Sequence, residues 1–68
     1  KCYWFGVELL PSLTRKHPQQ PSLDRLDNNL GYIKDNVILT CYSANIGRNE
    51  TDKKTWIEFI KQINPNIY

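Results

Sequence analysis

Two extended segments separated by a turn-rich loop constrain this chain more than any other feature of its sequence. Residues 36–40 (NVILT) are rich in β-branched side chains and are the clearest strand candidate, and residues 22–26 (SLDRL) are a second. Between them, Asn28-Asn29-Leu30-Gly31 is a strong turn signal, because asparagine and glycine tolerate positive φ. The pattern predicts a β-hairpin with a loop of roughly ten residues, in which Gly31 permits the sharp turn.

After the hairpin, the apolar residues follow the period of a helix. Residues 43–48 (SANIGR) predict a short helix that ends near Gly47. A second helix is predicted from Thr51 or Asp52, either of which can serve as its N-cap, to Gln62. It ends before Pro65, since the residue that precedes a proline avoids the helical conformation. Its apolar side chains recur at helical spacing: Trp56, Ile57, Phe59, Ile60 and Ile63.

The length of 68 residues and a formal charge of +2 are compatible with one small domain and a mildly basic surface. Residues 1–10 are apolar and predict an irregular segment packed on the core, and residues 11–21 predict a loop. We therefore expect a single α+β domain over residues 1–68, with a hairpin-and-helix core at about residues 21–50. No apolar run approaches about 18 residues and no secretory signal is visible, so we expect no membrane span and an intracellular, cytoplasmic location.

Residues with hard oxygen ligands flank the predicted hairpin. Asp24 lies in the first strand, Asn36 opens the second, and Asn45 lies on the short helix that follows. Carboxylate and amide oxygens suit Mg²⁺ or Mn²⁺ rather than zinc. Arg48 lies one turn beyond Asn45, and a metal beside an arginine suits a phosphodiester substrate. Each residue alone has an ordinary structural interpretation, so only their arrangement indicates a site.

This arrangement resembles the HNH family of ββα-metal nucleases over residues 21–50, with a weaker extension back to Cys2. The step of nine residues from Asn36 to Asn45 fits the family. The segment DRLDNNLGYIKDNV is especially similar to phage-type members, which often carry Asp-Arg at this place, so a phage or mobile-element context is expected. The resemblance is carried by Asp24-Arg25, Asp35-Asn36 and the segment CYSANIGR from Cys41 to Arg48.

The resemblance implies a divalent-metal-dependent DNA endonuclease that hydrolyses phosphodiester bonds, by nicking or by double-strand cleavage. It implies Asp24 and Asn45 as ligands of Mg²⁺ or Mn²⁺, and Asn36 as a brace of the hairpin loop that orients the general base. DNA is the implied partner, and sequence specificity would require additional DNA-binding domains or a larger parent chain. Contacts to DNA phosphates are expected from Arg15, Lys16, Arg25 and Arg48.

The two cysteines also match the family pattern in part. Zinc-bearing members have two Cys-x-x-Cys pairs, whereas this chain has Cys2 with Phe5 and Cys41 with Ala44. The resemblance implies that apolar packing replaces the zinc staple, with Cys2 and Cys41 close together and no structural zinc. A disulfide between them, in a small secreted protein, stays open as an alternative.

Arg25 is the departure from the family that matters most. The family's general base is a histidine directly after the first aspartate, and an arginine stays protonated at neutral pH. In one interpretation, the chain is an active nuclease whose base is His17 or Asp27, or in which a metal-bound water ionises without a protein base, while Arg25 binds phosphate. In a second, it is a slow or structure-selective nuclease. In a third, it is a catalytically inactive HNH-like DNA-binding module.

Overall fold

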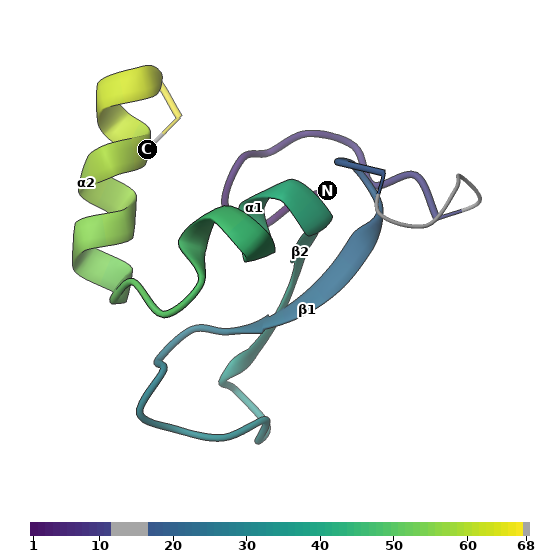
Figure 1. Ribbon diagram of the computed structural model, residues 1–68, viewed down its shortest axis with the longest axis vertical. Helices are drawn as coiled ribbons and strands as arrows, with labels where there is room; N and C mark the ends of the chain where they lie inside the picture. Colours follow the sequence, from purple (N-terminus) through teal and green to yellow (C-terminus); the bar gives the residue numbers. More distant parts are fainter. Residues whose placement is uncertain (12–16, 68) are drawn as a thin grey trace.

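The computed structural model describes residues 1–11 and 17–67, and the chain folds as a two-stranded antiparallel sheet followed by two helices (Figure 1). Pro21 pairs with Cys41 at one end of the sheet, and Arg25 pairs with Val37 at the other. The predicted α+β fold, with a hairpin followed by a helix, is confirmed. The elements are β1 (Pro21–Arg25), β2 (Val37–Cys41), α1 (Tyr42–Arg48) and α2 (Lys53–Ile63).

The buried face of the hairpin carries polar side chains, and its exposed face carries apolar ones. Side chains alternate across a strand, and here Asp24 and Thr40 are on the buried face. Leu23 and Leu39, which pair with each other on the opposite face, remain 55% and 48% exposed. Because the buried face carries polar groups, each of them needs a partner within the protein. This requirement organises the residues around Asp24.

The hydrophobic core joins the N-terminal segment, the junction of β2 with α1, and α2. Its buried members are Cys2, Trp4, Cys41, Ala44, Trp56 and Ile60, with Phe5 packed against them. The backbone N–H of Cys41 donates to Sγ of Cys2 at 3.2 Å, and both cysteines are free thiols. The expected packing of the two cysteines with Phe5 and Ala44 is therefore present in the structure.

Helix α1 ends at Arg48, as predicted for residues 43–48, and one residue beyond Gly47. It continues through Gly47 to Arg48, and Asn49 ends it with a positive φ of 51°. Asparagine tolerates this conformation better than most residues, so the chain can turn there without a glycine. Gly47 instead lies where α1 faces the indole ring of Trp56.

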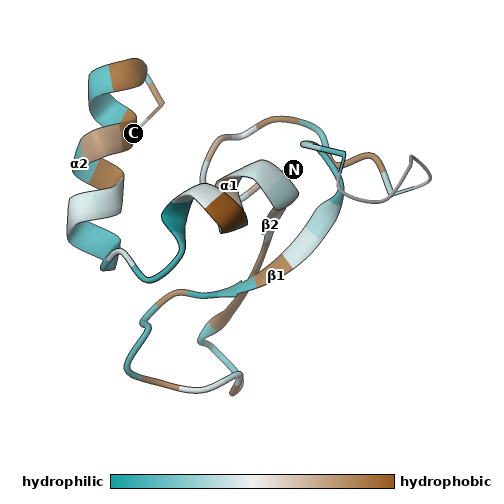
Figure 2. Cartoon of the chain, viewed as in Figure 1, coloured by the Kyte–Doolittle hydropathy of each residue, from teal (hydrophilic) through white to brown (hydrophobic). Residues whose placement is uncertain are grey.

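Helix α2 begins after Asp52, whose side chain accepts a hydrogen bond from the backbone N–H of Thr55 at 3.1 Å. Of the two N-cap candidates, Asp52 is therefore the cap. Trp56 and Ile60 are buried against the core, and Figure 2 shows hydrophilic and hydrophobic residues alternating along the helix. No helix among the described residues is long and apolar enough to span a membrane.

The loop between the strands contains two four-residue turns, and the N–H of Ile33 also donates to the carbonyl of Gly31 at 2.9 Å. The N–H of Leu30 donates to the carbonyl of Asp27, and the N–H of Asn36 donates to the carbonyl of Ile33. The positive φ in this loop belongs to Asp35, at 72°, whereas Gly31 does not adopt one. The predicted role of Gly31 as the residue that permits the sharp turn is wrong, since its backbone conformation is open to any residue.

Candidate functional site

Asp24 lies near the end of β1 with both carboxylate oxygens engaged. Its Oδ2 accepts from Nη1 of Arg48 at 3.0 Å and from Nε1 of Trp4 at 3.0 Å. Its Oδ1 accepts from the backbone N–H of Arg25 at 2.7 Å. Only 7% of the Asp24 side chain is exposed, and the Arg48 side chain is fully buried. The carboxylate is thus neutralised by an internal cation.

Arg48 connects the end of α1 to the segment that follows β1. Its guanidinium lies over the ring of Trp4, 4.8 Å from the ring centroid. Besides Asp24, it donates to three backbone carbonyls, those of Arg25, Leu26 and Thr51. The predicted contact between Arg48 and a DNA phosphate is not compatible with this arrangement, because the side chain has no exposed surface and four of its five N–H groups already donate within the protein.

Asn45 is fixed to the strand that carries Asp24. Its Nδ2 donates to the carbonyl of Leu23 at 3.0 Å and to Oγ of Ser22 at 2.6 Å. Leu23 directly precedes Asp24, so α1 brings Asn45 to the same strand, as expected for a helix that follows a hairpin. Among the described residues, no donor is paired with Oδ1 of Asn45, which leaves this oxygen available as a ligand.

Asn36 is buried and braces the hairpin loop from within. Its Oδ1 accepts from the backbone N–H of Asp27 at 2.8 Å, and its Nδ2 donates to the carbonyls of Asp27 and Gly31 at 3.1 and 2.9 Å. A single side chain thereby joins both ends of the loop. This is the brace that the resemblance implied for Asn36.

The guanidinium of Arg25 also binds the hairpin loop, through backbone carbonyls. Its Nη1 donates to the carbonyls of Asn28 and Leu30 at 3.2 and 3.3 Å, and its guanidinium lies 5.6 Å from the ring centroid of Tyr32. Successive side chains of a strand point to opposite faces, so Arg25 is directed away from the buried face of Asp24. In this structure, the position where the family places its base is occupied by a residue that orders the loop.

The other candidate bases are His17, which lies apart from Asp24, and Asp27, which accepts a hydrogen bond within the hairpin loop. His17 belongs to the turn before β1, where its Nδ1 accepts from the N–H of Gln19 at 3.1 Å. Asp24 is close to the other end of β1, about 10 Å along the strand from its start. Asp27 is exposed, and its Oδ1 accepts from the N–H of Asn29 at 2.9 Å.

Arg15 and Lys16, two predicted phosphate contacts, are outside the described residues.

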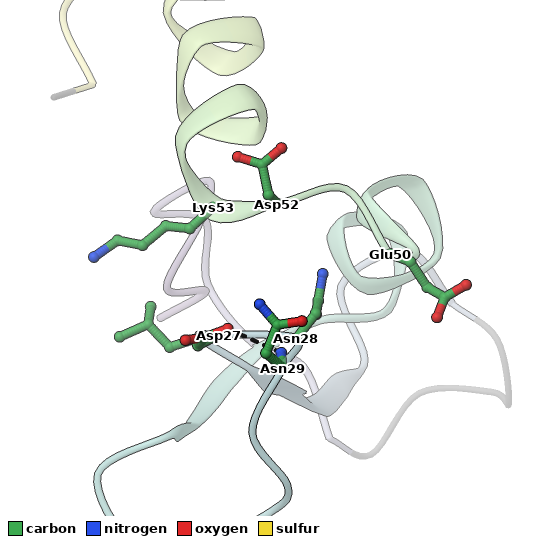
Figure 3. Close-up of a pocket in the computed structure, with 7 residues that line it drawn as sticks. Asp27, Asn28, Asn29, Glu50, Asp52 and Lys53 are labelled. Carbon is green, nitrogen blue, oxygen red and sulfur yellow. Dashed lines mark hydrogen bonds between the residues drawn. The ribbon is translucent and has the colours of Figure 1, made fainter.

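A pocket of about 380 Å³ lies between the hairpin loop and the start of α2 (Figure 3). Asp27, Asn28 and Asn29 line it from the loop, and Asp52 and Lys53 line it from the helix. Nδ2 of Asn28 joins the two sides by donating to the carbonyl of Thr51 at 3.1 Å. Neither Asp24 nor Asn45 lines this pocket, and the described residues contain no cluster of three His, Cys, Asp or Glu side chains that could hold a metal.

Whether a divalent cation such as Mg²⁺ or Mn²⁺ fits at Asp24 and Asn45 depends on the ligand atoms that these two side chains offer. These ions are commonly bound by one or two carboxylates, with waters and substrate phosphates filling the other positions. One carboxylate and one amide oxygen match that pattern in ligand type. The guanidinium of Arg48, however, competes with a cation for Oδ2 of Asp24.

Comparisons with models of protein families, with curated proteins and with solved structures found no match. The function proposed below therefore rests on the chain's own residues and on their resemblance to the HNH pattern.

Proposed function

We propose that this chain is an HNH-like, divalent-metal-dependent endonuclease that hydrolyses phosphodiester bonds of DNA. The observation that carries the proposal is the bond from Nδ2 of Asn45 to the carbonyl of Leu23, because it holds an amide oxygen at the strand that presents Asp24. Asp24 and Asn45 would bind Mg²⁺ or Mn²⁺ with the cation replacing Nη1 of Arg48 at Oδ2 of Asp24 and with Oδ1 of Asn45 as the second ligand. When bound, the cation supplies Lewis-acid polarisation of the phosphate and lowers the pKa of a bound water.

The chain's own residues have distinct tasks in this proposal. Asn36 and Arg25 hold the loop after β1 in one shape, which positions the end of β1 against the substrate. The guanidinium of Arg25 keeps its proton and therefore is not the proton acceptor, and His17 is not the acceptor because it lies at the opposite end of β1. This leaves the exposed carboxylate of Asp27 or solvent to take the proton from the attacking water.

One observation favours a second candidate, a catalytically inactive HNH-like module that binds DNA without cleaving it. The ion pair between Asp24 and Arg48 is buried, and both side chains have further hydrogen-bond partners inside the protein, so the carboxylate is already neutralised by an internal cation. Removing one partner of such a pair is strongly destabilising, which means that a metal ion at Asp24 has to compete with a favourable arrangement.

Cleavage of supercoiled plasmid in Mg²⁺ or Mn²⁺ tests the first candidate. We expect Asn45→Ala to lower the nicking rate by roughly 100-fold, since ligand oxygens and their supports contribute factors of this order. Asn66→Ala, at an exposed asparagine near the C-terminal end, is the matched control and should cleave like the wild type. Equal rates for the two variants would contradict the proposed metal site.

Fluorescence anisotropy with labelled DNA at low and high salt separates the two candidates. Binding that weakens with salt, without cleavage of any DNA form, would identify the inactive module. Absence of both binding and cleavage would overturn both candidates.

A further inference from the structure

The sulfur of Cys2 faces two backbone N–H donors and one hydroxyl group. Oγ1 of Thr40 lies 2.9 Å from it, the backbone N–H of Cys41 donates to it at 3.2 Å, and the backbone N–H of Phe5 donates to it at 3.4 Å. A thiol has a single proton and needs few partners, whereas a thiolate gains from every donor that faces it. The environment of Cys2 is therefore suited to the charged form of the sulfur.

Cys41 has the opposite environment, although it is the neighbour of Cys2. Its side chain is fully buried beside Ala44, and its Sγ lies 3.4 Å from Oγ of Ser43. Burial raises the pKa of Cys41, and the adjacent Cys2 raises it further. Burial opposes ionisation of Cys2 as well, but the hydrogen bonds from Thr40, Phe5 and Cys41 together lower the pKa of Cys2 below its usual range.

The pair thus combines a sulfur whose ionisation is favoured by hydrogen bonds with a sulfur whose ionisation is opposed by burial, brought together from positions 2 and 41 of the chain. Two cysteines of this kind are the arrangement used in thiol–disulfide exchange, in which one sulfur attacks and the second resolves. The described residues place no third His, Cys, Asp or Glu with them in a metal-binding group. Redox chemistry is therefore better matched to the pair than metal binding.

We propose that Cys2 and Cys41 are a redox-active thiol pair that forms an intramolecular disulfide by exchange with a small disulfide such as oxidised glutathione. The Cys2 thiolate attacks one glutathione sulfur, the glutathione disulfide bond breaks, and one glutathione thiolate leaves. Cys41 then loses its proton, attacks the Cys2 sulfur of the mixed disulfide and expels the second glutathione thiolate. Two protein thiols lose two electrons, and the two protons they release protonate the two glutathione thiolates.

Access to Cys2 requires local opening of the N-terminal segment, since the residue is buried. The N–H of Cys2 donates to the carbonyl of Val7, the N–H of Tyr3 to that of Leu39 and the N–H of Gly6 to that of Cys2, while Trp4 is anchored in the core. Local opening costs less free energy than global unfolding, so the proposed opening is confined to residues 1–3 and leaves Trp4 in place. Once formed, the disulfide would fix the segment that carries Trp4, which donates to Asp24, so oxidation would act on the candidate site.

The test exposes the full native chain to oxidised glutathione at neutral pH, followed by acid quenching, alkylation and mass spectrometry. We expect the wild type to pass through one glutathione adduct to a product that has lost two hydrogens and takes up no alkylating reagent. Cys41→Ser should stop at the glutathione adduct on Cys2, because the resolving thiol is absent. Cys2→Ser should react at Cys41 at least about tenfold more slowly.

Three results would overturn the proposal: only glutathione adducts on the native wild type, a disulfide that forms only in guanidinium, or equal reaction rates for the two serine variants. Cys→Ala at each position, checked by circular dichroism, controls for the effect of a buried serine. A second readout needs no variant. The oxidised wild type should melt at least about 5 °C above the reduced form, because the disulfide constrains the unfolded chain. An unchanged or lower midpoint would contradict a disulfide that fits the native fold.

Discussion

Arg48 and Asp24 form a buried ion pair, 3.0 Å between Nη1 and Oδ2, that joins the end of α1 to the end of β1. Trp4 completes this unit by donating to the same carboxylate oxygen and by stacking beneath the guanidinium. The three residues come from three separate segments, so this polar unit fastens the N-terminal segment, the hairpin and α1 to one another.

Loss of the charge at position 48 should therefore destabilise the whole fold. Arg48→Met leaves the Asp24 carboxylate buried without its cation, and we expect it to lower the free energy of unfolding by about 3–5 kcal/mol. Arg48→Lys keeps the charge but loses the fork of donors to the backbone carbonyls, so it should also be destabilising. Urea denaturation followed by circular dichroism measures both. A loss below about 1 kcal/mol for Arg48→Met would contradict a buried pair.

The hydrogen bonds of Asn36 predict a large loss of stability for a substitution at Asn36 and a small one for a substitution at Asn29, which lies in the same loop. Asn36→Ala removes three hydrogen bonds and leaves loop groups without partners, so we expect a loss of about 2–3 kcal/mol in the free energy of unfolding. Asn29→Ala changes an exposed side chain of the same loop and should cost less than about 0.5 kcal/mol. Similar losses in parallel urea titrations would show that the loop does not depend on Asn36.

Arg25→His tests whether a base at position 25 serves the proposed reaction. A neutral imidazole can accept a proton, so the nicking rate should rise by roughly tenfold or more over the wild type. This rise should be present above a pH of about 6.5 and should be lost as the pH falls and the imidazole gains its proton. Arg25→Gln also removes the guanidinium but adds no base, and it should show no rise. Identical pH–rate profiles for the two variants would exclude a base at this position.

We expect the stability of α2 to depend on pH through its N-cap residue, Asp52. The hydrogen bond from the backbone N–H of Thr55 lowers the pKa of the Asp52 carboxyl below its ordinary value. A lowered pKa in the folded state means that the cap stabilises the helix above the ordinary pKa and is lost as the pH falls through the folded value. Thermal melts from pH 7 down to pH 2 should therefore show a smaller acid-induced drop for Asp52→Asn, which caps without titrating. An equal drop in both proteins would assign the acid sensitivity to other carboxyls.

Much of the local structure follows from local patterns. The two strands and both helices lie within one or two residues of their predicted bounds, because alternation, helical periodicity and capping are properties of neighbouring residues. In the hairpin loop a positive φ occurs at Asp35 and not at Gly31, which shows the limit of this reasoning. Glycine permits a positive φ but does not require one, so the path of the chain selects the residue.

The sequence by itself determined the α+β hairpin-and-helix order, because strand, turn and helix patterns are properties of neighbouring residues. The brace at Asn36 and the approach of Asn45 to β1 were expected from the resemblance to the HNH pattern, since Asn45 is 22 residues from Leu23. Only the tertiary structure decided that Arg48 is an internal partner of Asp24 and that Arg25 orders the loop. Trp4 and Arg48 are 20 and 24 residues away from Asp24, and no local pattern specifies which of these long side chains will meet. The buried polar face of the hairpin decided it, since a carboxylate removed from water requires a cation and donors inside the protein.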